Sequence, residues 1–419
     1  MKSDNAESIR NKLRSLGVTK GTSSLPARKP RKSGFPIDAV VSGEDVETIE
    51  GSTYVVRTLY PYDQLHGKVN IGQQVGLTTL ARWGKLEYQN LAKTNLVFLD
   101  TETSGLSGGV GTFVFMVGLG YFCEEGLQVI QLFMRNPGDE AGLLAYLDQV
   151  LTPFEVLVTF NGKSFDIPVL NHRYTLHRLS SSVAGRPHLD LLHIARRLWK
   201  ERLPSRTLGA LEQEIIGFSR GQDEVPGWMV PELYVEYLQS GDSRPLAGVF
   251  YHNEMDIVSL GALLVCVAEL LERPLHEATP HGLDMAAIGR IYEDLDEIQK
   301  AVAYYERSID MGMPRNEFIR TVMRYALIHK KRAEWDQACL LWEKAAELDH
   351  IEACVELAKF FEHQACNLVL ARHWTQNGLA LAETTIRSKY SRQQVETLLL
   401  HRLSRVERKI GSAEELSED

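Results

Sequence analysis

The sequence contains few cysteines and lacks a long apolar segment. Its five cysteines are odd in number, widely spaced and without a Cys-x-x-Cys pair, which argues against a disulfide framework and against a thiolate zinc site. The best apolar runs, 113–122 and 260–271, are interrupted by glycine and by Glu269, whereas a membrane helix needs about 18 uninterrupted apolar residues. No apolar stretch follows residues 1–6, so no secretory signal is expected. These absences predict reduced cysteines, no membrane partner and a cytoplasmic location.

The composition predicts a globular protein with an uneven charge distribution. The 419 residues are 44% hydrophobic and 24% charged, enough for one sizeable core, or two at a prior of about 150 residues per domain. The net charge is −9, yet residues 1–35 carry nine Lys or Arg and only two acidic residues. Such a basic arm is a handle for nucleic acid. A solvated, disordered tail without a partner explains the same residues, and the sequence leaves both interpretations open.

The central part alternates between strand and helix patterns. Apolar or β-rich runs predict strands at 53–59, 96–100, 112–121, 127–134 and 156–160, the first in a hairpin with 47–49 around Gly51. Helical spacing predicts helices at 140–151, 167–179, 189–203, 208–216 and 253–271. This order indicates an α/β fold, a mixed sheet covered by helices.

After residue 283 the strand patterns end and amphipathic helices follow. An aromatic residue opens a similar phrase at Tyr305, Trp342 and Trp374, at spacings of 37 and 32 residues. A period near 34 residues resembles degenerate tetratricopeptide (TPR) units, and an ordinary helical bundle is the alternative. TPR-like repeats would take a protein partner. The expected organisation is a basic disordered tail (1–35), a β-rich leader (36–90), the α/β domain (91–273), a linker (274–282), the repeats (283–385) and a C-terminal helix with an acidic tail (386–419).

Three clusters of acidic residues lie at the ends of predicted strands or the starts of predicted helices. Asp100 and Glu102 end the strand at 96–100, and on an extended chain they share one face about 6 to 7 Å apart. Asp166 opens a helix after the strand at 156–160, and Asp256 lies in the helix at 253–271. Converging carboxylates suit Mg²⁺ or Mn²⁺, which take hard oxygen ligands. Each cluster alone has a plain explanation, such as a solvated strand end or a helix N-cap at Asp166 with a buried Phe165.

Taken together, the clusters resemble the DEDD (DnaQ-like) exonuclease superfamily within the ribonuclease H-like fold. The Asp-x-Glu motif matches Asp100 and Glu102, the N-x3-FD motif matches Asn161 with Phe165-Asp166, and the closing aspartate matches Asp256. More narrowly, the segments 100–112 and 188–197, together with a helical tail, resemble the YprB-type ribonuclease H-like proteins. The resemblance covers about residues 91–272.

The resemblance implies a metal-dependent 3′–5′ exonuclease acting on DNA or RNA. Asp100, Glu102, Asp166 and Asp256 would hold two Mg²⁺ or Mn²⁺ ions about 3.5 to 4 Å apart, and phosphodiester hydrolysis would proceed between them. The implied substrate contacts are Thr101, Thr103, Asn161, Lys163, Phe165 and Tyr251.

The position of the general base departs from the superfamily pattern. Members place His five residues before the closing aspartate, or Tyr four before it, and here Tyr251 and His252 are exchanged. We favour His252 because a neutral imidazole accepts a proton near pH 7, whereas a tyrosine would need a strongly lowered pKa. His252 and Asp256 are also i and i+4 on one helix face. Tyr251 would then position the attacking water or pack.

Two further features leave the function open. A group of cations follows Asp190, and it would either attract a phosphate backbone or simply form a solvated helix face. The group comprises Arg196, Arg197, Lys200, Arg202 and Arg206. Asp190 itself is expected to cap a helix. The alternative to a nuclease is a catalytically silent ribonuclease H-like scaffold that acts through its repeats, and a further alternative is a nucleic-acid binder that uses the basic arm.

Overall fold

The computed structural model describes residues 34–88, 91–105, 112–221, 224–273 and 281–418. The expected basic arm up to residue 33, the glycine-rich segment 106–111 and residues 274–280 of the expected linker lie outside this range.

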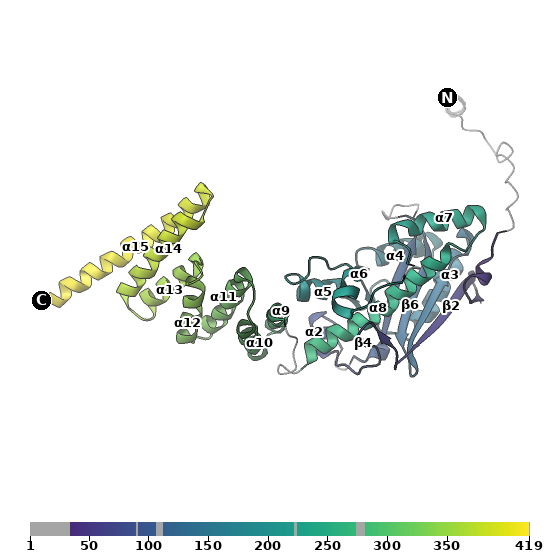
Figure 1. Ribbon diagram of the computed structural model, residues 1–419, viewed down its shortest axis with the longest axis horizontal. Coiled ribbons are helices and arrows are strands. Elements are labelled where there is room, and N and C mark those ends of the chain that lie inside the picture. Colours follow the sequence, from purple (N-terminus) through teal and green to yellow (C-terminus); the bar gives the residue numbers. More distant parts are fainter. Residues whose placement is uncertain (1–33, 89–90, 106–111, 222–223, 274–280, 419) are drawn as a thin grey trace, which may run out of the picture.

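Seven strands form one mixed sheet in the order β1-β2-β7-β6-β5-β8-β9 (Figure 1). Their bounds are β1 (Glu44–Thr48), β2 (Gly51–Pro61), β5 (Leu96–Thr103), β6 (Val114–Phe122), β7 (Gly126–Phe133), β8 (Val156–Thr159) and β9 (His188–Asp190). In the order of the sheet, neighbouring strands among β1, β2, β7, β6 and β5 pair antiparallel, whereas β5, β8 and β9 pair parallel. The carboxyl ends of β5, β8 and β9 therefore lie next to one another at the same end of the sheet. A separate short pair consists of β3 (Leu65–His66) and β4 (Val69–Asn70).

Helices cover both faces of this sheet. They are α2 (Thr78–Trp83), α3 (Glu140–Leu151), α4 (Asp166–His177), α5 (Leu191–Trp199), α6 (Leu208–Leu211), the π-helix η5 (Glu212–Ile216), α7 (Val230–Ser240) and α8 (Leu246–Glu272). Short 3-10 turns are η2 (Ile37–Ala39), η3 (Lys93–Asn95), η4 (Pro137–Asp139) and η6 (Gly227–Met229).

The central strand β5 is apolar on both sides because both of its faces are covered. Leu96 and Phe98 pack in one cluster with α5 and most of α8. Val97 and Leu99 point the other way, into a cluster with α3, α4 and α7. Alternation along the strand then carries Asp100 and Glu102 to the α8 side.

The predicted α/β fold class, a mixed sheet flanked by helices and followed by helical segments, is confirmed. The hairpin around Gly51 forms as β1 and β2, and β2 joins the main sheet beside β7. Three details differ from the sequence prediction. The helix expected at 189–203 is preceded by strand β9, whose three residues are too few for a strand pattern. Helix α7 carries only two buried apolar residues, Val230 and Tyr234, and was not predicted. Helix α8 begins at Leu246 rather than at residue 253. Its first two turns were not predicted because they mix aromatic, small and polar residues.

The C-terminal part consists of helices that pack as successive antiparallel neighbours. They are α9 (Gly282–Asp294), α10 (Ile298–Met311), α11 (Arg315–Lys331), α12 (Trp335–Ala346), α13 (Ile351–His363), α14 (Leu368–Thr385) and α15 (Lys389–Glu418). The tight turns before α10, α12, α13 and α14 each contain a left-handed residue, namely Asp296, Ala333, Asp349 and Cys366. The recurring aromatic residues Tyr305, Trp342 and Trp374 lie on α10, α12 and α14, respectively. The sequence period therefore corresponds to a repeated helix pair.

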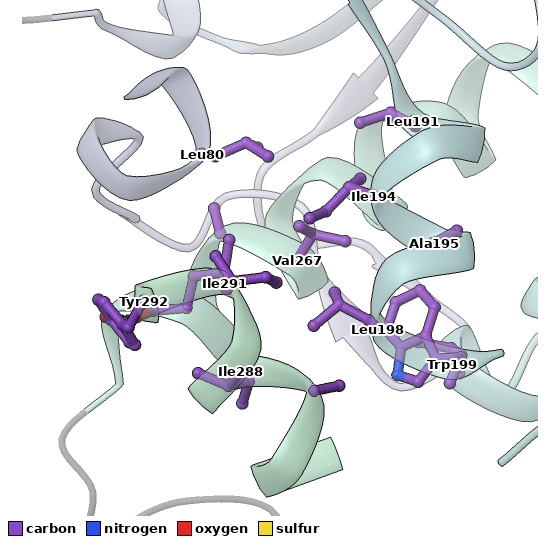
Figure 2. Close-up of a cluster of buried hydrophobic side chains, with 14 of the residues drawn as sticks. Leu80, Leu191, Ile194, Ala195, Leu198, Trp199, Val267, Ile288, Ile291 and Tyr292 are labelled. Atoms are coloured by element: carbon purple, nitrogen blue, oxygen red, sulfur yellow. Dashed lines mark hydrogen bonds between the residues drawn. The ribbon is translucent and has the colours of Figure 1, made fainter. Parts of the chain in front are cut away.

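The first helix of this run shares its core with the sheet-containing part. Figure 2 shows Ile288, Ile291 and Tyr292 of α9 beside Leu198 of α5 and Val267 of α8. The Tyr292 hydroxyl donates to the Leu271 carbonyl at 2.6 Å. Ion pairs Arg197–Asp294 and Arg202–Asp284 border this contact. One continuous hydrophobic core thus extends from the sheet into the helical run.

None of the helices described here is both long and apolar enough to span a lipid bilayer.

Candidate active site

Asp100 is held by a buried amide on α8. Its Oδ2 accepts a hydrogen bond from Asn253 Nδ2 at 3.0 Å. Asn253 is fully buried, and its Oδ1 accepts from Gln131 Nε2 at 3.1 Å. The orientation of the Asp100 carboxylate is therefore fixed by a polar contact between α8 and the sheet.

Gly118 creates the space for this contact. It lies opposite Asp100 in the register between β5 and β6. A Cβ atom at this position would come within 2.4 Å of Asn253 Oδ1. Only a glycine lets α8 bring its amide this close to the strand.

Asp166 is tied to the same strand from the other side. As the first residue of α4, it accepts two hydrogen bonds at Oδ1, from the Thr101 backbone N–H at 3.0 Å and from Thr101 Oγ1 at 2.5 Å. Asp166 is therefore not the N-cap of its helix. That position is taken by Phe165, which is 59% exposed rather than buried.

The turn between β8 and α4 is held by Asp190. Its carboxylate accepts from the backbone N–H groups of Asn161 at 2.7 Å and Lys163 at 3.2 Å. It also caps α5 by accepting from the Leu192 N–H, as the sequence predicted. Asn161 adopts a left-handed φ of 67°, a conformation that asparagine tolerates better than most residues.

His252 and Asp256 face each other on α8. The distance from His252 Nε2 to Asp256 Oδ2 is 3.6 Å, and His252 Nδ1 lies 2.8 Å from Glu224 Oε1. Tyr251 points elsewhere, and its hydroxyl accepts from the Gly221 N–H at 3.2 Å. Of the two exchanged residues, His252 is the one beside the carboxylate.

Arg220 is a central residue that sequence reasoning missed. Its guanidinium makes a bidentate pair with Glu212, with contacts of 2.8 and 2.6 Å. It also contacts Asp256, and it lies 3.0 Å from Glu224. Arg220 and Glu224 come from an irregular segment with no period, so the sequence carried no signal for them. Asn253 had a weak signal, because it lies between His252 and Asp256 on the same helix.

Burial raises the pKa values of the four candidate carboxylates. Desolvation is the largest cause for each. The charges of Asp256 and Asp166 further raise the pKa values of both Asp100 and Glu102, so these four groups form one electrostatic cluster. The pKa of Asp166 rises only to about 6, since the bonds from Thr101 oppose the effect of burial. The pKa of Asp256 is raised by burial and held back by Arg220 and His252.

The remaining predicted residues lie around this cluster in different roles. Thr103 Oγ1 donates to the Gly105 carbonyl at 2.9 Å, a local turn contact. The Lys163 side chain is exposed next to the Asn161 turn. Among the predicted cations after Asp190, Arg197 and Arg202 pair with α9, and Arg206 bonds the carbonyls of Leu203 and Pro204. Arg196 and Lys200 are exposed on α5.

A cavity of about 530 Å³ opens beside His252 and Asp256. Glu212, Arg220 and Glu224 line its polar side. Of the four candidate carboxylates, Asp256 lines this space.

The carboxylate oxygens of the four candidate acids are the type of ligand that a divalent cation such as Mg²⁺ or Mn²⁺ prefers. Asp100, Asp166 and Asp256 each have one carboxylate oxygen bound by a neighbouring side chain. These acids are buried and repel one another, so a bound cation would stabilise their charged forms. Within the ranges the structure describes, no three such side chains converge at metal-binding distance. Cation binding would therefore require side-chain movements toward a common point.

This fold is that of a ribonuclease H-like protein. Residues 97–268 match the model of the RNase_H superfamily, and the fold is of the nuclease type.

Over 361 residues, the chain is 32% identical to the uncharacterized protein YprB of Bacillus subtilis (strain 168), an alignment that covers 84% of this chain and 83% of the relative. The chain belongs to the YprB family of ribonuclease H-like proteins. Among solved structures, the family B DNA polymerase from the hyperthermophilic archaeon Pyrobaculum calidifontis aligns over 50% of this chain and 30% of its own. That alignment has 16% identity and a TM-score of 0.32, and it does not bear on the assignment.

Proposed function

We propose that this protein is a metal-dependent nuclease that hydrolyses phosphodiester bonds, with 3′–5′ exonuclease activity on DNA or RNA. The observation that carries the proposal is the electrostatic cluster of Asp100, Glu102, Asp166 and Asp256 at one edge of the sheet. Two Mg²⁺ or Mn²⁺ ions held by these residues would stabilise charge on the phosphate and lower the pKa of water. Nucleic acid is accordingly the proposed substrate.

His252 is the proposed general base. His252 Nδ1 lies 2.8 Å from Glu224 Oε1 and 3.3 Å from the Arg220 guanidinium. We assign the proton to Nδ1, because the carboxylate is the nearer partner and accepts it. Nε2 is then unprotonated on the side facing Asp256, where it can take a proton from an attacking water. The Tyr251 hydroxyl is engaged by the Gly221 N–H and lies outside this proton path.

Residues that would contact the substrate surround the cluster. Phe165 is exposed next to Asp166 and offers a ring on which a base can stack. Lys163 is exposed on the neighbouring turn and offers a cation to phosphate. Thr101 would act indirectly, because its hydroxyl is committed to Asp166. The paired helices after α8 would take a protein partner, as TPR-like repeats do.

The proposal is tested with oligonucleotides of DNA and RNA labelled at the 5′ end, incubated with the protein in Mn²⁺ or Mg²⁺ or in EDTA. We expect a ladder of progressively shorter products in metal and intact substrate in EDTA. Products of one internal length would show an endonuclease instead.

His252→Ala separates the base from the metal ligands. We expect its rate at pH 7 to fall about 100-fold, with a smaller deficit at higher pH as hydroxide replaces the base. Tyr251→Phe is the matched control and should keep most of the activity. The reverse result would make Tyr251 the base. Intact substrate under every condition, with the protein folded, would favour the silent scaffold.

A further inference from the structure

Arg220 lies where the candidate cluster meets a second group of acidic residues. Its side chain is 12% exposed and bridges three carboxylates, those of Glu212, Glu224 and Asp256. It reaches the site from an irregular segment that follows η5, and it lines the cavity beside His252. A guanidinium with several fixed partners holds them in one plane, which a single ammonium group cannot do.

A buried chain of polar groups anchors this guanidinium. Glu212 is 2% exposed, and its Oε1 accepts a hydrogen bond from Ser259 Oγ at 2.6 Å. Ser259 is in turn 2.8 Å from His66 Nε2 on the β3–β4 pair. Burial lowers the pKa of His66 to about 4, so its ring is neutral and adds no charge. The chain runs from β3 through α8 to Asp256.

The partners of Arg220 are the groups that the proposed reaction needs. Its contact is with Oδ1 of Asp256, which turns Oδ2 toward His252. Its contact with Glu224 fixes the carboxylate that holds His252 Nδ1. Without the guanidinium, both carboxylates would be free to rotate, and buried repulsion with Glu212 would drive them apart.

We propose that Arg220, anchored by Glu212, is a positioning residue that orients Asp256 for divalent-cation binding and His252 for proton transfer. The proposal rests on the proposed function, because it assigns the cation to the Asp256 cluster. Arg220 lies outside the acidic sequence motifs, and it orients Asp256 directly and His252 through Glu224.

The direction in which metal affinity changes when Arg220 is removed distinguishes an orienting role from a purely electrostatic effect of its charge. Arg220 is a cation beside a cation site, so its charge alone would weaken metal binding, and removing it would tighten binding. If Arg220 acts by orienting Asp256, its removal weakens binding instead. Groups that orient metal ligands typically change metal affinity by about 10- to 100-fold when they are lost.

The test is titration calorimetry of Mn²⁺ into the full chain without nucleic acid. We expect Arg220→Gln and Arg220→Lys each to lower the Mn²⁺ affinity about 10-fold or more. The lysine should not rescue binding, because it keeps the charge but loses the planar bridge. Ser259→Ala, which removes the bond to Glu212 together with the contact to His66 but keeps the guanidinium, should give a smaller loss in the same direction and serves if the Arg220 variants do not fold.

Arg173→Gln is the matched control. Arg173 of α4 forms a similar partly buried bidentate pair with Glu140 of α3, at 2.7 and 2.5 Å. Its loss should lower stability and leave the Mn²⁺ affinity unchanged. Equal or tighter Mn²⁺ binding by Arg220→Gln, or full rescue by lysine, would overturn the positioning role while leaving the proposed nuclease intact. A wild-type chain that binds no Mn²⁺ would overturn both.

Discussion

At the scale of single residues, three of the four candidate carboxylates are oriented by a specific neighbour. Asn253 holds Asp100, Thr101 holds Asp166 and Arg220 holds Asp256. Each contact uses one oxygen and is made in a desolvated environment, where hydrogen bonds to charged groups are worth about 1.5 to 3 kcal/mol. The site is preorganised by residues that do not themselves belong to the acidic motifs.

We predict that Gly118→Ala disrupts the Asp100 contact. The new Cβ would overlap Asn253 Oδ1, so the amide must move and leave buried polar groups unpaired. The free energy of unfolding should fall by about 2 kcal/mol in urea titrations. Gly138→Ala, where no atom lies within 4 Å of the added Cβ, is the control and should unfold like the wild type. Equal losses in the two variants would contradict this role for Gly118.

Raised carboxylate pKa values predict a characteristic pH dependence of stability without metal. Burial raises the pKa of Asp166 to about 6 from an ordinary value of 3.8, so between these values the folded chain binds more protons than the unfolded chain. The contribution of Asp166 to stability therefore decreases as the pH rises from about 4 through 6. In EDTA at pH 7, Asp166→Asn should melt at a higher temperature than the wild type. The exposed Asp310→Asn serves as control, and identical melting of the wild type and Asp166→Asn would argue against the buried cluster.

Phe165 is predicted to bind substrate rather than to stabilise the fold. It is largely exposed beside Asp166, and stacking of a base on an aromatic ring is worth about 1 to 3 kcal/mol. Phe165→Ala should raise KM about 10-fold and leave urea unfolding nearly unchanged. Leu176→Ala, at a 51% exposed position on the same helix, should change neither quantity. A large loss of stability in Phe165→Ala would point to packing instead.

At the scale of elements, α5 connects the site to the helical run through two different faces. One face is buried against α8 and α9, where Ile194, Leu198 and Trp199 pack (Figure 2). The other exposes His193, Arg196 and Lys200, which recur at helical spacing. Its N-terminus is fixed beside the Asn161 turn by Asp190. An exposed row of basic residues thus begins next to the candidate site.

This row predicts a salt-dependent contact with the nucleic-acid backbone. The double variant Arg196→Gln/Lys200→Gln should weaken binding of a long oligonucleotide and lower the slope of log affinity against log salt by about 1.5 to 2. Fluorescence anisotropy over a salt series, in EDTA to prevent cleavage, measures both quantities. The pair Arg307→Gln/Lys331→Gln, exposed on α10 and α11, is the control. An unchanged slope would mean that the α5 row is only solvated.

Much of the sheet and of the candidate site could be predicted from the sequence, because local patterns carried them. The apolar runs that end at Asp100 and near Asn161 identify two adjacent parallel strands, and their ends must meet. The contacts of Arg220 could not be predicted, since they depend on how an irregular segment folds back over α8. Strand β9 was missed because its existence depends on pairing with β8 rather than on its own three residues.

At the scale of the whole molecule, the helical run is attached through a shared core rather than through a surface contact. Ile288, Ile291 and Tyr292 of α9 are buried together with residues of α2, α5 and α8. Arg82–Glu297 and Arg197–Asp294 pair across the border of this contact. A partner bound to the first helix pair would therefore be held in a defined position relative to the candidate carboxylate cluster.

We predict that the sheet and the first helix pair unfold together. Ile291→Ala removes a fully buried side chain from the shared core and should cost about 2 to 4 kcal/mol. Differential scanning calorimetry should then show the helical run separating as an earlier transition. Leu340→Ala, at an exposed position on α12, should leave the trace unchanged. Two well-separated transitions already present in the wild type would contradict a shared core.

We propose that the four carboxylates form a divalent-cation nuclease site. The initial rates at which the wild type and Asp100→Asn shorten a 5′-labelled single-stranded oligonucleotide in Mn²⁺ test this proposal. We predict stepwise shortening by the wild type and a rate at least about 100-fold lower for a folded Asp100→Asn. Equal rates for the two proteins, or no cleavage by the wild type in either Mn²⁺ or Mg²⁺, would contradict it.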